Sequence, residues 1–124
     1  MQYCSLQATL TRNRNLRIII YESKWRKAPF KQWFKKLKDL KGKAKTRTRL
    51  NRLKLNNYGD FKYLQQGTYE LRINFGPGYR VYFAKLQNEE IVLLLNAGSK
   101  QTQEKDINKA INYWKLFKER FNHE

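Results

Sequence analysis

The chain has 124 residues, which suits a single domain with one core, and its 27 Lys and Arg against 10 Asp and Glu give a formal net charge of +17. A charge of that size opposes compaction, so we expect an acidic partner: nucleic acid, a ribosome, an anionic membrane surface or an acidic protein. With one cysteine (Cys4) and one histidine (His123), the sequence offers no internal disulfide and argues against zinc or His-dependent catalytic sites, and we expect no metal and no cofactor.

Residues 1–15 are polar and show no clear periodicity, so we predict an N-terminal extension of a domain that covers residues 16–121. This segment has no apolar stretch typical of a cleaved signal. No part of the chain approaches the ~20 apolar residues needed to span a bilayer. We therefore expect a cytoplasmic protein that does not bind membranes.

Residues 16–21, LRIIIY, are short and rich in β-branched residues, which predicts a buried first strand. The next segment predicts an amphipathic helix that Pro29 can start at its first position. Its apolar face consists of Phe30, Trp33, Phe34, Leu37 and Leu40. We predict that Gly42 separates this helix from a second one over residues 44–55.

Positive charge is concentrated around this second helix. Seven cations occur there with no acid among them: Lys41, Lys43, Lys45, Arg47, Arg49, Arg52 and Lys54. Residues 1–60 carry 17 cations and 3 acids, a net charge of +14, whereas residues 61–124 carry 10 and 7, a net charge of +3. A solvated helix face normally mixes both signs, so the run favours contact with a polyanion, with a merely solubilising face as the alternative.

After a turn at residues 59–60 and a short strand over 61–65, residues 69–83 read YELRINFGPGYRVYF. Apolar and polar residues alternate on both sides of Gly-Pro-Gly, which predicts a β-hairpin. Arg72, Arg80 and Tyr82 then share one sheet face, and two guanidiniums with a phenol suit a phosphodiester. The alternative is a solvated outer face that carries arginines.

Residues 91–95, IVLLL, are apolar on both faces, which predicts a strand in the middle of the sheet. A small-residue corner, residues 97–100, then displays Lys100. A helix from about Gln103 follows, with Glu104 and Asp106 in its first turn. The order of one strand, two helices, three or four strands and one helix predicts an α+β fold with a small antiparallel or mixed sheet packed by helices.

In this order, the segments resemble toxins of the RelE/ParE superfamily, specifically the HigB-like addiction-module killer proteins of type II toxin–antitoxin systems. The resemblance spans about residues 16–121 and rests on FKQWFKKLKDL, RLNRL, GDFKYL, ELRINFGPGYRVYF, IVLLL and AGSKQTQEKDI. It implies a RelE-like single domain that cleaves messenger RNA on the ribosome without a metal, using the RNA's own 2′-hydroxyl, and so inhibits translation. It also implies a cognate antitoxin, for which we expect a small helix-turn-helix protein.

The resemblance also implies roles for particular residues. Arg80 matches the arginine that such enzymes place on the scissile phosphate, Lys100 a second cation after the central strand, and Arg72 a cation in the preceding strand. Lys62 is implied as a further cation. Together with the cations of the second helix, it would bind RNA or the ribosome: Lys43, Lys45, Arg47, Arg49, Arg52 and Lys54.

Proton transfer is the step for which the resemblance supplies no residue, because the family's catalytic histidine and tyrosine have no clear counterpart here. Tyr79 or Tyr82 could act, with a pKa lowered by the neighbouring arginines, or Lys100 could serve as a general acid. Two other functions share these features. They are a ParE-like inhibitor of DNA gyrase and a basic module that docks on nucleic acid without cutting it.

Overall fold

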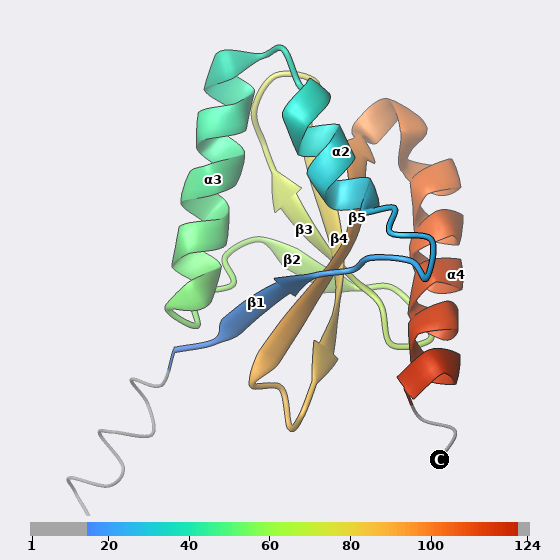
Figure 1. The fold of residues 1–124 in the computed structure, drawn as a ribbon. Coiled ribbons are helices and arrows are strands. Elements are labelled where there is room, and N and C mark those ends of the chain that lie inside the picture. The colour runs from blue at the N-terminus through green and yellow to red at the C-terminus, as the bar shows by residue number, and fades with distance from the viewer. Residues whose placement is uncertain (1–14, 122–124) are drawn as a thin grey trace, which may run out of the picture.

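The computed structural model describes residues 15–121, which form five strands and three α-helices (Figure 1). The predicted extension, residues 1–15, lies outside the described residues except for Asn15. In chain order the elements are β1 (Arg17–Ile20), α2 (Pro29–Lys36), α3 (Leu40–Lys54), β2 (Phe61–Tyr63), β3 (Tyr69–Ile73), β4 (Tyr79–Leu86), β5 (Ile91–Ser99), the 3₁₀-helix η1 (Lys100–Thr102) and α4 (Gln103–Phe121).

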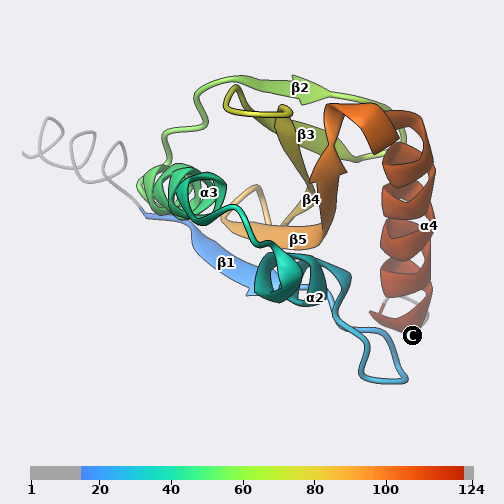
Figure 2. The same cartoon turned by 90° about the horizontal axis from the view of Figure 1, so that it is seen from above.

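The strands make one mixed sheet in the order β1-β5-β4-β3-β2. β1 runs parallel to β5, and the other neighbouring strands are antiparallel. Helices α2 and α3 lie on one side of the sheet and α4 lies on the other (Figure 2). The prediction of an α+β fold with a mixed sheet packed by helices is therefore confirmed.

Each face of the sheet has its own core. Alternate residues of β3 and β4, including Leu71, Val81 and Phe83, pack with Phe30 of α2 and Leu53 of α3. The residues between them face α4, where the second core includes Tyr82, Ala84, Leu93, Ala110 and Trp114. The period of two in the strands thus divides the apolar side chains between two helical layers.

The first strand differs from its prediction. β1 is an edge strand with one neighbour, β5, and its residues are half-buried or exposed, with Ile20 at 42 % exposure. The buried side chains are those of Leu16 and Tyr21, which flank it. A run of β-branched residues indicates a strand but does not tell how many neighbours the strand has.

The break between the first two helices also lies elsewhere than predicted. α2 begins at Pro29 as expected but ends at Lys36, and Leu40, 77 % exposed, already belongs to α3. Asp39 caps α3 by accepting a hydrogen bond from the Gly42 backbone N–H at 3.0 Å. Gly42 lies inside the helix and is buried against Tyr79, so that a Cβ there would approach a ring carbon of Tyr79 to 2.5 Å.

The hairpin and the central strand are confirmed. Gly76 and Gly78 have positive φ angles of 57° and 81° in the turn between β3 and β4. β5 is buried between β1 and β4, and it continues to Ser99, so most of the predicted corner is strand. α4 begins at Gln103 with Glu104 and Asp106 in its first turn. No helix within the described chain is long and apolar enough to cross a membrane.

Candidate functional site

A cluster of polar side chains lies on the face of the sheet toward α4, and it includes two arginines. Arg72 of β3 lies opposite Arg80 of β4 in the antiparallel register, and Tyr82 lies opposite Glu70. Because residues two apart on a strand share a face, Arg72, Arg80 and Tyr82 lie on one face, as predicted. This face is not the solvated surface that was the alternative, since Arg80 and Tyr82 are buried.

Glu70 organises this pair, and sequence reasoning missed it. Its carboxylate has no exposed surface. It accepts a hydrogen bond from Nε of Arg72 at 2.9 Å and another from Nε2 of Gln103, in α4, at 2.7 Å. Oε2 of Glu70 also lies 3.9 Å from Nε of Arg80. The hydrogen bond to Glu70 raises the pKa of Arg72, so its charge is held firmly. The one available signal was an acid alternating with Arg72 in the predicted strand.

Arg80 is the most unusual side chain of the cluster. The residue is 8 % exposed, and neither its Nε nor its Nη1 has a hydrogen-bond partner among the described residues. A buried donor without an acceptor costs about 1–3 kcal/mol, and more for a charged group. The Glu70 carboxylate compensates part of the charge from 3.9 Å, but it does not occupy these N–H groups. Arg80 therefore carries buried N–H donors that no described residue uses.

Lys100 completes what we call the cationic cluster, defined as Arg72, Arg80 and Lys100. It begins η1 directly after β5, and its backbone N–H donates to the carbonyl of Gly78 at 2.8 Å. A Cβ built on Gly78 would lie 3.4 Å from Cβ of Lys100 and 3.6 Å from Nη1 of Arg80. An exposed lysine and a buried arginine therefore lie close to the same glycine.

The predicted lowering of a tyrosine pKa is wrong for both candidates. Tyr79 lies on the opposite face of the sheet, in the core under α2 and α3, where its hydroxyl donates to Asp39 at 2.6 Å. Burial and this carboxylate raise the pKa of Tyr79 to about 12. Burial also raises the pKa of Tyr82, the Glu70 carboxylate raises it further, and the opposing effect of Arg80 is smaller. Neither phenol is poised to act as a base near neutral pH.

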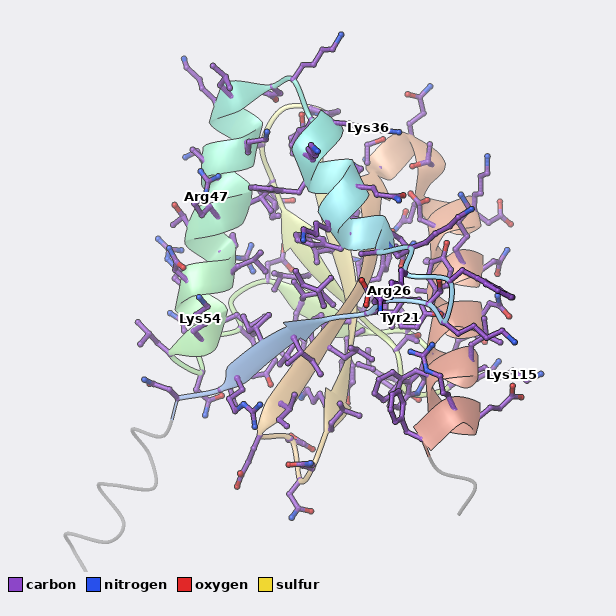
Figure 3. The ribbon with its side chains drawn as sticks, viewed as in Figure 1. Tyr21, Arg26, Lys36, Arg47, Lys54 and Lys115 are labelled. Carbon is purple, nitrogen blue, oxygen red and sulfur yellow. The ribbon has the colours of Figure 1, made fainter. Side chains whose placement is uncertain are left out.

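The cations of α3 do not form a single surface. Lys43 and Arg47 lie over the ring of Phe34, at 5.3 and 5.1 Å from its centroid, on the side of α2. Figure 3 labels Arg47 and Lys54 on α3. A groove forms on the other flank of the helix. We call it the α3 groove, and it is lined by Lys41, Lys45, Arg49 and Arg52, with Ala44 and Thr48, against Ile73, Asn74 and Phe75.

Arg49, predicted to bind RNA, has a structural role. Its Nη2 donates to the carbonyls of Tyr58 at 2.8 Å and Asp60 at 3.3 Å, and its Nη1 donates to the carbonyl of Arg72. Burial lowers the pKa of this guanidinium. Arg49 therefore ties α3 to the start of β2 and to β3, and most of its donors are already used.

Lys62 is exposed on β2, opposite Glu70 in the register with β3, so it lies on the same face as the cationic cluster.

The polar residues Asp106 and Asn96 lie beside the cationic cluster. Asp106 of α4 accepts a hydrogen bond from Thr102 at 2.5 Å, and its backbone carbonyl accepts one from Asn96 at 3.0 Å. Within residues 15–121, no three His, Cys, Asp or Glu side chains gather closely enough to hold a metal ion.

The fold and this site define a small, strongly basic α+β protein with a cationic cluster at one end of its sheet. No family model matches the chain. It is 51 % identical over 81 residues to a protein of Haemophilus influenzae that is described as uncharacterized, and the match covers 65 % of this chain and 81 % of that protein. The chain belongs to the same family as that protein.

Proposed function

We propose that the protein is a HigB-like toxin of the RelE/ParE superfamily that cleaves messenger RNA on the ribosome and acts in the cytoplasm. The observation that carries this proposal is Arg80, a nearly buried guanidinium with unpaired N–H donors beside Arg72 and Lys100. Such a group suits the phosphorane-like charge of a phosphodiester transition state, because a charged donor with little exposed surface has little water to displace. The order of strands and helices is compatible with a RelE-like domain.

In the proposed reaction, Arg80 and Arg72 hold the scissile phosphate, and the RNA's 2′-hydroxyl gives its proton to water as its oxygen attacks phosphorus. The new bond closes a cyclic phosphodiester, and the bond from phosphorus to the 5′-oxygen breaks. The 5′-oxygen leaves and takes up a proton. Lys100 is exposed, and both its Cβ and Nη1 of Arg80 lie close to Gly78, so we assign Lys100 to this proton or to the developing charge. Tyr79 and Tyr82 have no part in our proposal, because both pKa values are raised.

The raised tyrosine pKa values favour a second candidate: a protein of the same kind that binds without cutting. A ParE-like gyrase inhibitor or a basic docking module needs no proton-transfer group. In each toxin function the proposed protein partner is a cognate antitoxin of the helix-turn-helix type.

Primer extension on a defined messenger in a purified translation system tests the nuclease. We expect cuts at fixed codon positions only when ribosomes are present. They should be absent with Arg80→Ala and partly restored with Arg80→Lys, which keeps a positive charge close to Glu70. Tyr79→Phe is the control, since its hydroxyl lies on the opposite face, and it should cut like the wild type.

Thermal unfolding of each variant separates lost chemistry from lost structure. An intact messenger combined with growth arrest on expression would contradict the nuclease and favour the gyrase inhibitor. Arrest and cutting by a folded Arg80→Ala protein would remove Arg80 from the mechanism.

A further inference from the structure

The α3 groove is a second cationic surface, separate from the cationic cluster. Lys41, Lys45 and Arg52 are exposed along one flank of α3, and they face the end of β3 without an acid among the groove's lining residues. Lys45 lies over the ring of Phe75, 5.6 Å from its centroid, which holds this ammonium at the groove wall. Three exposed cations along one wall suit a chain of phosphates.

One turn of the chain connects this groove to the cationic cluster. At the start of the β3–β4 turn, Asn74 and Phe75 line the groove. At its end, Gly78 lies against Lys100 and Arg80. The turn lies at the same end of the molecule as the start of α3 and the start of α4 (Figure 1). Gly76 and Pro77, between the two ends, are exposed and present little side chain.

The carboxylates near this turn are already engaged. Asp39 accepts hydrogen bonds from the Tyr79 hydroxyl and the Gly42 backbone N–H. Asp60 accepts one from the side-chain amide of Asn74 at 2.9 Å. A polyanion that follows the turn therefore meets cations at both ends of the turn. The carboxylates that lie between these ends already accept hydrogen bonds from the protein.

We propose that the α3 groove binds the phosphates of a single-stranded nucleic acid that passes around the β3–β4 turn to the cationic cluster. The two sites lie on opposite faces of the sheet, so one ligand reaches both only by bending sharply. A single strand bends easily, whereas a duplex resists bending over tens of base pairs. That the strand is the substrate RNA rests on the proposed function, but the groove's preference for a single strand does not.

Helix α3 offers a matched pair of variants for the test. Lys45 and Arg52 are seven residues apart and line the groove. Arg47 and Lys54 are also seven residues apart, but they lie about 200° further round the helix. Changing either pair to glutamate removes two cations and adds two anions, so each double variant lowers the net charge by four, from +17 to +13.

The experiment measures anisotropy of a labelled deoxy-oligonucleotide, which lacks the 2′-hydroxyl and cannot be cut, over a series of salt concentrations without ribosomes. We expect Lys45→Glu with Arg52→Glu to weaken binding more than tenfold and to lower the salt slope by about two. Arg47→Glu with Lys54→Glu should weaken binding less than threefold. The same sequence as a duplex should bind the wild type less tightly than the single strand.

Equal losses for the two pairs would overturn the proposal, since diffuse attraction depends on net charge alone. Tighter binding of the duplex, or equal displacement of the oligonucleotide by polyglutamate of the same charge, would also overturn it. If the messenger is not cleaved but the groove pair selectively loses oligonucleotide binding, the proposed function is wrong and the groove proposal stands. If cleavage requires Arg80 but is equally strong in the two double variants, the proposed function stands and the groove proposal is wrong.

Discussion

Glu70 has no exposed surface, and side chains from β3, β4 and α4 surround its carboxylate. An ionised carboxylate in such a place is costly unless it is paired and hydrogen-bonded. Arg72 and Gln103 supply the hydrogen bonds, and Arg80 supplies a second positive charge at 3.9 Å. One acid therefore holds two arginines on one face that would otherwise repel each other.

A second carboxylate, Asp39, makes the stability depend on pH. The hydroxyl of Tyr79 and the backbone N–H of Gly42 lower the pKa of Asp39 below 3.8, so its contribution is present above about pH 4 and is lost as the pH falls. The pKa of Tyr79 is raised from 10.0 to about 12, so its contribution is present below pH 10 and is lost as the pH rises toward 12.

We predict that Tyr79→Phe flattens both ends of this profile. The measurement is the free energy of unfolding in urea against pH, as the difference between wild type and variant, because burial also raises the pKa of other tyrosines such as Tyr21 and Tyr58. Tyr79→Phe should lose less stability than the wild type above pH 10 and below pH 4. Parallel profiles for the two proteins would contradict the assignment.

At the scale of the element, the docking of α4 on the sheet requires Gly98. A Cβ at this position of β5 would lie 1.9 Å from Oδ2 of Asp106 and 2.9 Å from Oγ1 of Thr102. Gly98 is also the register partner of Arg80. The first turn of α4 can therefore approach the strand beside the cationic cluster only because this residue has no side chain.

We predict that Gly98→Ala destabilises the protein by about 1–3 kcal/mol, as overpacking of a close contact usually does. Urea unfolding measures the change. Asp106→Ala should also destabilise, because it removes the hydrogen bond from Thr102. The double variant relieves the clash and should be more stable than the sum of the single changes predicts. Strict additivity would show that Asp106 is not what the new methyl group meets.

For the whole molecule, repulsion among the cations that give the net charge of +17 outweighs the attraction within the few ion pairs that the described residues form. These ion pairs involve Glu70 and Glu89. Repulsion between like charges then opposes the folded state, and salt screens it. Most cations lie in the first half of the chain, and α3 carries them on two flanks.

We predict that the unfolding temperature rises by a few degrees between about 0.02 and 0.5 M sodium chloride, as repulsion is screened. Differential scanning fluorimetry measures it, and the double variant Arg47→Glu with Lys54→Glu should show a smaller rise because it carries less charge. An unfolding temperature that falls with salt would mean that attractive pairs dominate.

The amino-acid sequence by itself determined the elements and their faces. The alternation around Gly76 and Gly78 was enough to place Arg72 and Arg80 on one face of a hairpin, because side chains on a strand repeat every two residues. Pro29 and the acids near Gln103 marked where α2 and α4 begin. The excess of positive charge was equally clear from the sequence, because net charge follows directly from the residue types.

Only the tertiary structure decided what covers each face. Alternation does not tell that Tyr82 is buried against α4 while Tyr79 is enclosed by α2 and α3, so the expected lowering of the two tyrosine pKa values was wrong. It also does not tell that Glu70 becomes the partner of both arginines, or that Arg49 bonds to carbonyls while Lys45 lines a groove. Burial and pairing depend on contacts between residues distant in the chain, and local periodicity carries no information about those contacts.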